Sequence, residues 1–321
     1  MDIGFLGRRW FASTAAVALI APASVLLGGA AAKPPPPPAL PVATLTSVAA
    51  TSAGNAWAVG FTARGTSQPV ILHWNGRAWA RAVIPATPRS GFLNGVAAIS
   101  AKDAWAVGET IYHRPFTLHW NGAQWSRVAV PAQPKYAVLD GVAGTSPKDV
   151  WAVGGKLDSY GFSTLGELAL HWNGTVWKPV PVPNLYPDSG AMNRVTALSP
   201  SNAWGVGYTG IQASIFHWNG EVWKRSKVRL HLDGNSLEGV SGSRADDMWA
   251  VGGSSYGLSL ILRWNGTTWQ HYQAPRPTLG GALNSVVATS PRNAWAVAQA
   301  ATAPSSSAGS SAGTAALGAG Y

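Results

Sequence analysis

Short apolar runs separated by turn residues fill the chain from residue 45 to residue 298. Between residues 95 and 130 the runs read GVAAIS, AWAVG, FTLHW and AQWSRVAV, and glycine, asparagine, proline or aspartate lies between them. Small, β-branched and aromatic residues dominate these runs, as is typical of β-strands. No stretch repeats its apolar positions every 3.6 residues, so the pattern predicts an all-β protein.

Tryptophan marks a repeat of these four runs. All but one of the 17 tryptophans occupy three fixed positions of a unit, and successive first positions lie 45 to 53 residues apart. A period of this length is typical of repeat architectures. The first-position residues are Trp57, Trp105, Trp151, Trp204, Trp249 and Trp295. Five units are complete, and a sixth contributes only two runs, at 283–298, although TAAL at 314–317 stands about where a third run would begin.

Four antiparallel strands (A to D) repeated at this spacing, with both sheet faces apolar, predict a β-propeller of five complete four-stranded blades and an incomplete sixth. The unit resembles the tryptophan-rich propeller repeats of secreted bacterial proteins, in the kelch-like and Asp-box-like neighbourhood. Gly76-Arg77-Ala78-Trp79 matches the end of an Asp-box, and Gly154-Gly155 and Gly252-Gly253 match the kelch double glycine. Trp74 stands where an Asp-box has aspartate, so the resemblance implies the fold and no subfamily.

The motif His-Trp-Asn-Gly joins strands C and D in four units, and the fifth has Arg-Trp-Asn-Gly. Asn-Gly between two extended runs predicts a two-residue type I′ hairpin, with Trp74 opposite Arg77 and Leu72 opposite Trp79. The two tryptophans then share one sheet face and pack against a neighbouring unit. We expect the histidines of the motif to be structural, because equivalent positions around a ring do not converge on a metal ion.

The two ends of the chain differ in composition from the repeat. Residues 1–32 have paired arginines, an apolar run and a small-residue cleavage site near Ala32, which predicts a signal peptide of twin-arginine-like type. Residues 33–44 are a proline-rich linker, residues 45–298 are the propeller, and residues 299–321 are expected to be a Ser/Ala/Gly-rich disordered tail. The predicted location is therefore secreted or cell surface, with no membrane segment after signal cleavage.

Composition narrows the functional classes. The chain has no cysteine and a formal net charge of +10, so disulfides and cysteine-ligated metals are excluded. The basic residues are scattered, which favours attraction to anionic polymers over a specific nucleic-acid site. No metal or cofactor is expected.

The B–C loops and the D–A crossovers lie on one side of the predicted disc, and they are longer and more variable than the turns on the other side. Function in scaffolded folds usually resides on such loops. Exposed tyrosines with basic and amide groups around them suit a polysaccharide or peptide ligand. The candidate binding residues are Tyr112, Arg114, Lys135, Tyr136, Asp158, Tyr160, Tyr186, Tyr208, Tyr256 and Arg276.

A second set of polar residues stands two positions before the valine that opens each innermost strand. Its members are Thr46, Asn94, Asp140, Asn193, Glu238 and Asn284. They are expected to ring the channel mouth, either as local caps of the turn into strand A or as a polar collar for a ligand.

These observations predict a secreted, non-catalytic propeller that binds polysaccharide or another cell-surface polymer on its variable loops. One alternative is a glycoside-acting hydrolase or lyase, which requires Glu109, Asp158 and Glu167 to meet in one pocket. Another is a truncated gene product without current activity. Because the sixth unit is incomplete, we also expect poor ring closure, a free edge beside Trp295 and self-association there.

Overall fold

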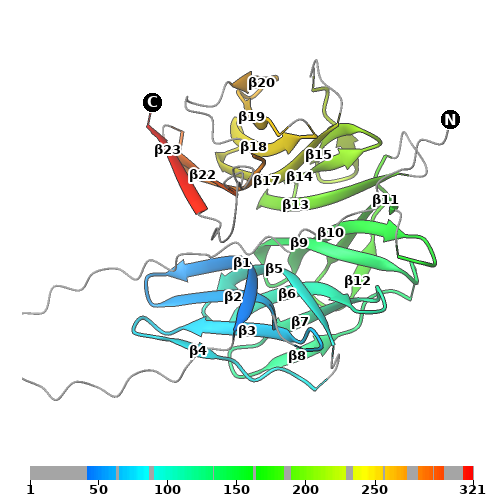
Figure 1. Ribbon diagram of the computed structural model, residues 1–321, viewed down its shortest axis with the longest axis vertical. Coiled ribbons are helices and arrows are strands. Elements are labelled where there is room, and N and C mark those ends of the chain that lie inside the picture. The colour runs from blue at the N-terminus through cyan, green and yellow to red at the C-terminus, as the bar shows by residue number, and fades with distance from the viewer. Residues whose placement is uncertain are drawn as a thin grey trace, which may run out of the picture.

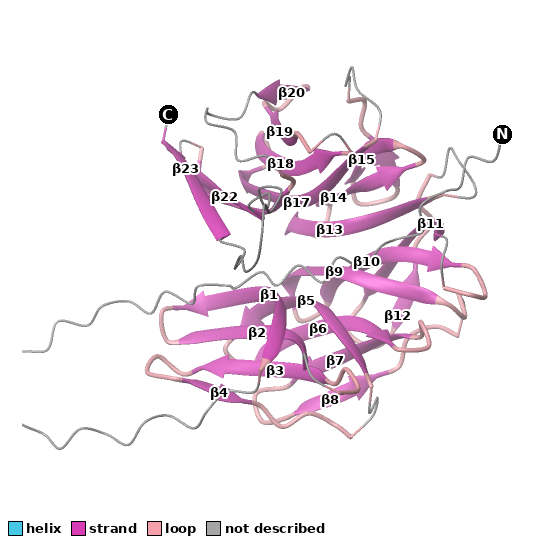
Figure 2. Cartoon of the chain, in the orientation of Figure 1, coloured by secondary structure: helices cyan, strands magenta, loops and turns pink. Residues whose placement is uncertain are grey.

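The computed structural model describes residues 42–62, 65–86, 90–132, 134–161, 164–183, 189–228, 234–255, 257–272, 281–291, 293–299 and 314–320. These residues form 23 strands and no helix (Figure 2). Accordingly, no helix within them is long and apolar enough to span a membrane.

Five sheets each contain four antiparallel strands in chain order, from the innermost to the outermost. The first holds β1 (Ala43–Ser52), β2 (Asn55–Thr62), β3 (Pro69–Trp74) and β4 (Trp79–Arg81). The second holds β5 (Gly91–Ser100), β6 (Asp103–Thr110), β7 (Pro115–Trp120) and β8 (Trp125–Val128). The third holds β9 (Ala137–Ser146), β10 (Asp149–Leu157), β11 (Thr164–Trp172) and β12 (Trp177–Pro179).

The fourth sheet holds β13 (Gly190–Ser199), β14 (Asn202–Thr209), β15 (Gln212–Trp218) and β16 (Trp223–Arg225). The fifth holds β17 (Asn235–Arg244), β18 (Asp247–Ser254), β19 (Ser259–Trp264) and β20 (Trp269–Tyr272). The sixth has three strands, β21 (Leu283–Ser290), β22 (Asn293–Gln299) and β23 (Thr314–Gly320). The predicted architecture of five complete sheets and an incomplete sixth is confirmed.

The sheets follow one another around the molecule, so that the sixth returns to the side of the first (Figure 1). Their innermost strands pack in series, from β1 through β5, β9, β13 and β17 to β21. Within the described residues, no strand of the sixth sheet packs against the first sheet to a similar extent. The six sheets therefore form an arc with a seam between the last sheet and the first.

Strand β23 lies in the segment that the sequence analysis assigns to a disordered tail. It pairs along its whole length with β22, from Gln299 opposite Thr314 to Asn293 opposite Gly320. The backbone of β22 offers a row of unpaired N–H and C=O groups, which an extended segment can satisfy whatever its side chains. The edge expected to be free beside Trp295 is therefore covered.

The hairpin between strands C and D differs from the predicted one. Trp74 pairs directly with Trp79, and Leu72 pairs with Arg81, so the loop contains four residues instead of two. Gly76 has φ +90° and Asn75 does not have positive φ, which rules out a type I′ turn. Asn75 instead accepts hydrogen bonds at Oδ1 from the backbone N–H groups of Arg77 and Ala78. The asparagine thus makes the turn with its side chain and not with its backbone conformation.

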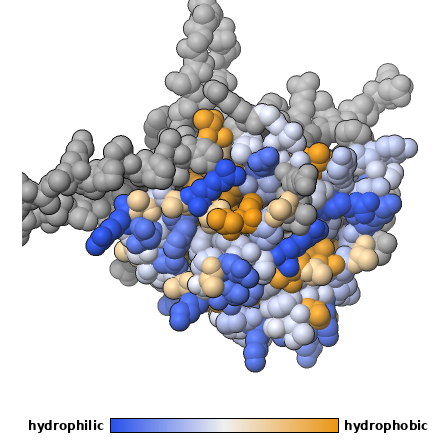
Figure 3. Space-filling model, turned by 90° about the horizontal axis from the view of Figure 1, so that it is seen from below, coloured by the Kyte–Doolittle hydropathy of each residue, from blue (hydrophilic) through white to orange (hydrophobic). Residues whose placement is uncertain are grey.

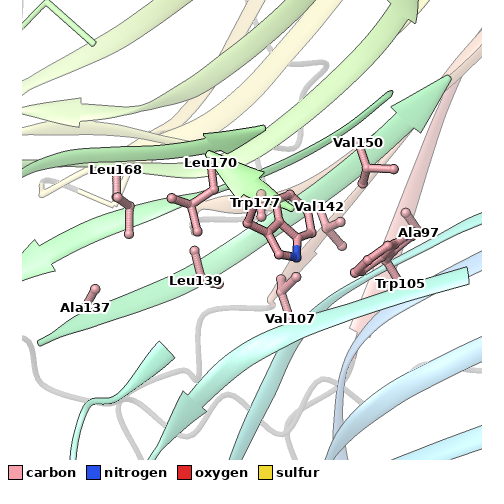
Figure 4. Close-up of a cluster of buried hydrophobic side chains, with 11 residues drawn as sticks. Ala97, Trp105, Val107, Ala137, Leu139, Val142, Val150, Leu168, Leu170 and Trp177 are labelled. Carbon is pink, nitrogen blue, oxygen red and sulfur yellow. The ribbon is translucent and has the colours of Figure 1, made fainter. Parts of the chain in front are cut away.

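The core lies between neighbouring sheets. At the second junction, Trp105 and Val107 of the second sheet pack with Leu139, Leu170 and Trp177 of the third (Figure 4). First- and third-position tryptophans are buried here and at the next two junctions, which confirms that they are core residues. The second-position tryptophans Trp74, Trp120 and Trp172 are only half-buried, and the indole N–H of each donates to a backbone carbonyl at the surface turn between strands A and B.

The histidine of the His-Trp-Asn-Gly motif lies on the opposite sheet face from the tryptophan that follows it. His73 stacks on Trp57 with ring centroids 4.1 Å apart, and its Nε2 lies 2.8 Å from Oδ1 of Asn55. The fifth unit keeps both contacts with Arg263, which lies over the Trp249 ring and donates to Asp247. Burial lowers the pKa of His73. These histidines join strand C to strand B, and no group of three potential metal ligands occurs among the described residues.

The outer surface is mixed in character. Hydrophilic side chains with several separate hydrophobic patches between them cover the face shown in Figure 3.

Candidate functional site

Antiparallel pairing puts the B–C loops and the D–A crossovers at one end of every complete sheet, as the sequence predicts. We refer to this end as the variable face. Six of the ten candidate binding residues come together on it, at the junction of the second and third sheets: Tyr112, Arg114, Lys135, Tyr136, Asp158 and Tyr160.

The loop between β6 and β7 is held closed by its own backbone. The N–H of Thr110 donates to the carbonyl of Arg114, and the N–H of His113 donates to the carbonyl of Thr110. The Thr110 hydroxyl also accepts from the N–H groups of Tyr112 and Arg114. His113 has φ 54°, an uncommon conformation for a residue other than glycine, which lets the loop reverse within a few residues. Tyr112 is left projecting from its tip, 73% exposed.

His113 ties this loop to a buried acid and to the third sheet. Its Nδ1 lies 2.7 Å from Oε2 of Glu109, which is 1% exposed. Its carbonyl accepts from the N–H of Ala137, the first residue of β9. A Cβ on Gly161 would lie 2.1 Å from Cδ2 of His113, so the loop after β10 rests directly on the imidazole. The i, i+4 spacing of Glu109 and His113 was the only sequence signal for this pair.

The crossover between the two sheets supplies the centre of the junction. The cations of Arg114 and Lys135 lie 4.8 and 5.2 Å from the centroid of the Tyr136 ring. The Tyr136 carbonyl accepts from the N–H of Leu157 at the end of β10, which fixes the crossover against the third sheet. An aromatic ring flanked by two cations therefore sits among the loops of two sheets.

The third-sheet loop completes the junction. Oδ1 of Asp158 accepts from the N–H of Tyr160, and the Asp158 carbonyl accepts from Gly161. This turn leaves the Tyr160 side chain 76% exposed. Asp158 shapes the loop that presents Tyr160, a role that sequence reasoning did not assign to it.

The remaining candidates are not part of this junction. The Tyr208 hydroxyl lies 3.2 Å from the hydroxyl of Thr164, at the next junction, between the third and fourth sheets. Tyr186, Tyr256 and Arg276 fall outside the described residues.

Glu167 occupies that next junction as a buried acid. It accepts a short hydrogen bond from the Thr209 hydroxyl of the fourth sheet, and its other carboxylate oxygen has no hydrogen-bond partner. Burial raises the pKa of Glu167, since desolvation penalises its charged form. Glu109 and Glu167 are thus buried at two different junctions, and the carboxylate cluster required for the hydrolase alternative does not form from them.

Replacing Glu167 with glutamine is expected to raise the midpoint of thermal unfolding at pH 7. The pKa of Glu167 is higher in the folded protein than in the unfolded protein, so ionising this carboxyl costs more free energy in the folded state. At neutral pH the ionised Glu167 therefore destabilises the fold. The gain should shrink as the pH falls from the raised folded-state pKa towards about 4.5, the ordinary pKa of the group, and it should be gone below that pH, where the carboxyl is neutral in both the folded and the unfolded protein. Melting curves of both proteins between pH 3 and pH 8 measure this. A constant difference over the whole range would contradict it.

The six channel-ring candidates share one structural position that the sequence did not reveal. Each is the extra residue of a β-bulge in an innermost strand, where pairing with strand B shifts register. The amides of Asn94 and Asn193 donate to the carbonyls of Leu139 and Leu237 in the following sheet. The Thr46 hydroxyl donates to the carbonyl of Leu93 in the same way.

Local capping of the turn into strand A was therefore the wrong interpretation for these three residues. The innermost strands begin earlier than predicted, at Gly91 and not at Gly95 in the second sheet, so the polar residue lies within the strand. A bulge turns its side chain toward the neighbouring sheet, where it finds a carbonyl. Asp140, Glu238 and Asn284 occupy the same bulge position. A ligand-binding role of the six residues stays a prediction.

Comparison with known proteins identifies the fold and no family. No family model matches the chain, and no curated protein matches it. A six-bladed β-propeller lectin from Aleuria aurantia has a TM-score of 0.55 at 12% identity, over 81% of this chain and 88% of the lectin. SapL1 lectin in complex with α-methyl fucoside has a TM-score of 0.54 at 12% identity, over 88% of this chain and 97% of the lectin. YCF48 from Cyanidioschyzon merolae has a TM-score of 0.52 at 16% identity, over 81% of each chain. The chain is a tryptophan-rich β-propeller.

Proposed function

We propose that this chain is a secreted, non-catalytic propeller that binds polysaccharide at the junction of the second and third sheets. The observation that carries the proposal is that the three loops bearing Tyr112, Tyr136 and Tyr160 contact one another, through Arg114 on the Tyr136 ring and Gly161 on His113. Aromatic rings offer flat apolar surfaces for sugar rings, and their hydroxyls remain free for polar contacts at the edge. The Aleuria aurantia and SapL1 lectins, which share the fold, support a carbohydrate ligand.

The charge of the junction favours an acidic polymer. Arg114 and Lys135 are exposed beside the Tyr136 ring, while Glu109 is buried and bonded to His113 and the Asp158 carboxylate accepts from the backbone of its own loop. The chain as a whole carries +10, which raises the local concentration of an anionic polymer around it. A cell-surface polysaccharide with carboxylate groups meets both requirements.

The framework beneath the loops supports binding with little rearrangement. His113 connects Glu109, Ala137 and Gly161, which belong to two sheets and two loops. A loop that is already ordered loses less conformational entropy when the ligand binds. We therefore assign to His113 the positioning of the loops and not direct contact with the ligand.

Export is a separate part of the proposal. It rests on residues 1–32, which lie outside the described residues and resemble a twin-arginine-like signal. N-terminal sequencing of the protein recovered from a culture medium, with a new terminus near residue 33, is the expected result. Retention of Met1 in the cell fraction would contradict it.

Binding is tested by a glycan array that includes neutral and carboxylated polysaccharides, followed by titration of the strongest hit. Replacing Tyr112 and Tyr160 together with alanine should weaken that binding about fivefold to 150-fold, because each aromatic contact contributes about 0.5–1.5 kcal/mol beyond area burial. Both side chains are mostly exposed, so the melting temperature should not change. Replacing Val222, an exposed residue of a C–D turn on the opposite end of the fourth sheet, is the matched control. A wild-type protein that binds no glycan, or a double variant that binds normally, overturns the proposal.

A further inference from the structure

Each junction between complete sheets is built from the same two faces. The first-position tryptophan of one sheet inserts between the second- and third-position tryptophans of the next. Trp57 lies 5.0 Å from both Trp120 and Trp125, between ring centroids. The same arrangement recurs at 4.8 to 5.4 Å for Trp105, Trp151 and Trp204. We call the face that carries the first tryptophan the trailing face and the face that receives it the leading face.

The trailing face of the sixth sheet has no such cover. Trp295 is 47% exposed and Val297 is 38% exposed, whereas their second-sheet equivalents, Trp105 and Val107, are both 0% exposed. Val287, which pairs with Trp295 across the strands and shares its face, is also exposed. A large apolar face with a tryptophan at its centre is unusual on a soluble monomer.

The leading face of the first sheet is the matching half. Val48 is 49% exposed, while its equivalents in the five other sheets, Val96 among them, are 6 to 9% exposed. The ring centroids of Trp74 and Trp79 lie 5.8 Å apart, and those of the receiving pairs at the internal junctions lie 5.7 to 6.1 Å apart. Both are half-buried, although the third-position tryptophan is buried in the other four complete sheets. The seam therefore exposes one trailing face and one leading face.

We propose that this seam is an interface between copies of the chain, in which Trp295 of one copy inserts between Trp74 and Trp79 of the next. The four internal junctions provide the template, because they are made by the same side chains at the same strand positions. The contact is heterologous, since two different faces meet, and after a single contact the dimer still has one free trailing face and one free leading face. Association should therefore continue beyond the dimer as concentration rises.

Electrostatics gives the proposed contact a characteristic salt dependence. Every copy carries +10, so copies repel one another at low ionic strength, while the faces that meet are apolar. Added salt screens the repulsion and leaves the apolar contact in place. Self-association through this seam is therefore expected to strengthen between 50 and about 500 mM NaCl.

Two single-face variants test the proposal. Trp295→Asp blocks the trailing face only, and Val48→Asp blocks the leading face only; both side chains are about half exposed, so the fold should survive. Light scattering after size exclusion, over a concentration series, should show larger species for the wild type and monomers for each variant alone. An equimolar mixture of the two variants should form dimers and nothing larger, since each retains one complementary face. Val222→Asp, with 48% exposure far from the seam, should behave as wild type.

Three results would overturn the proposal. A wild-type protein that is monomeric at every concentration shows that the seam closes within one chain. Self-association that persists in both variants places the contact elsewhere, for example along the edge of β23. A mixture that stays monomeric while the wild type associates excludes the head-to-tail pairing. None of these results bears on glycan binding, because the seam and the junction of the second and third sheets share no residue.

Discussion

Replacing Trp105 with alanine is expected to lower the free energy of unfolding by about 3–5 kcal/mol. The indole is fully buried and packs against His119 of its own sheet and Trp172 and Trp177 of the next. Removing it leaves a cavity between two sheets whose other side chains are held by strand pairing and cannot move in to fill it. Urea unfolding followed by circular dichroism measures the loss.

Trp295→Ala is the matched control for this experiment. It removes the same side chain from the same position of the repeat, but the indole is half exposed at the seam. Its cost should stay below about 1 kcal/mol. If the two variants lose equal stability, the buried tryptophan wedge is not what holds neighbouring sheets together.

Replacing Gly108 with alanine should cost about 1–3 kcal/mol or more, although it adds only one methyl group. A Cβ at this position would lie 1.9 Å from the carbonyl oxygen of Phe92 in the adjacent innermost strand. The bulge at Asn94 brings that strand against the glycine, and four other units have glycine at the same place with the same contact. The backbone of β5 would have to shift and lose part of its ladder. Chemical unfolding of the variant measures the loss.

Gly54→Ala is the control, since the nearest atom to its added Cβ lies 3.9 Å away. The sixth unit shows when the position tolerates a side chain: it has Ala298, which is buried. In the sixth unit β21 begins at Leu283, which pairs with Ala298. The residue equivalent to Phe92 comes just before Leu283 and is therefore not part of the strand. If Gly108→Ala is as stable as the wild type, β5 can move away from the added methyl group, and the close contact with Phe92 does not require glycine.

The repeat was predictable because its signals are local. Alternation of apolar residues, turn residues at fixed offsets and the tryptophan period all act within about 50 residues, and they identify the strands, their order and the number of sheets. The same local signals failed at the C–D hairpin. Asn-Gly is compatible with either a two-residue or a four-residue loop, and the choice depends on whether Trp74 pairs with Arg77 or with Trp79.

The sequence predicted which loops carry the candidate binding residues, but not which of these loops meet. Tyr112, Tyr136 and Tyr160 could be assigned to the variable face because strand direction alternates. Their meeting at one junction depends on contacts that sequence does not encode locally, such as the packing of Gly161 on His113 and the hydrogen bond from Ala137 to the His113 carbonyl.

The sequence by itself determined the class of fold, the repeat unit and the residues available for binding, because strand formation and turn chemistry depend on near neighbours. Only the tertiary structure decided which loops meet, where Glu109 and Glu167 are buried and which polar residues lie at bulges. It also showed that Val48 and Trp295, ordinary members of the repeat, differ from their equivalents by being exposed. Burial at these positions depends on the sheet that lies opposite, and a repeat that reads the same in every unit cannot show that one junction is missing.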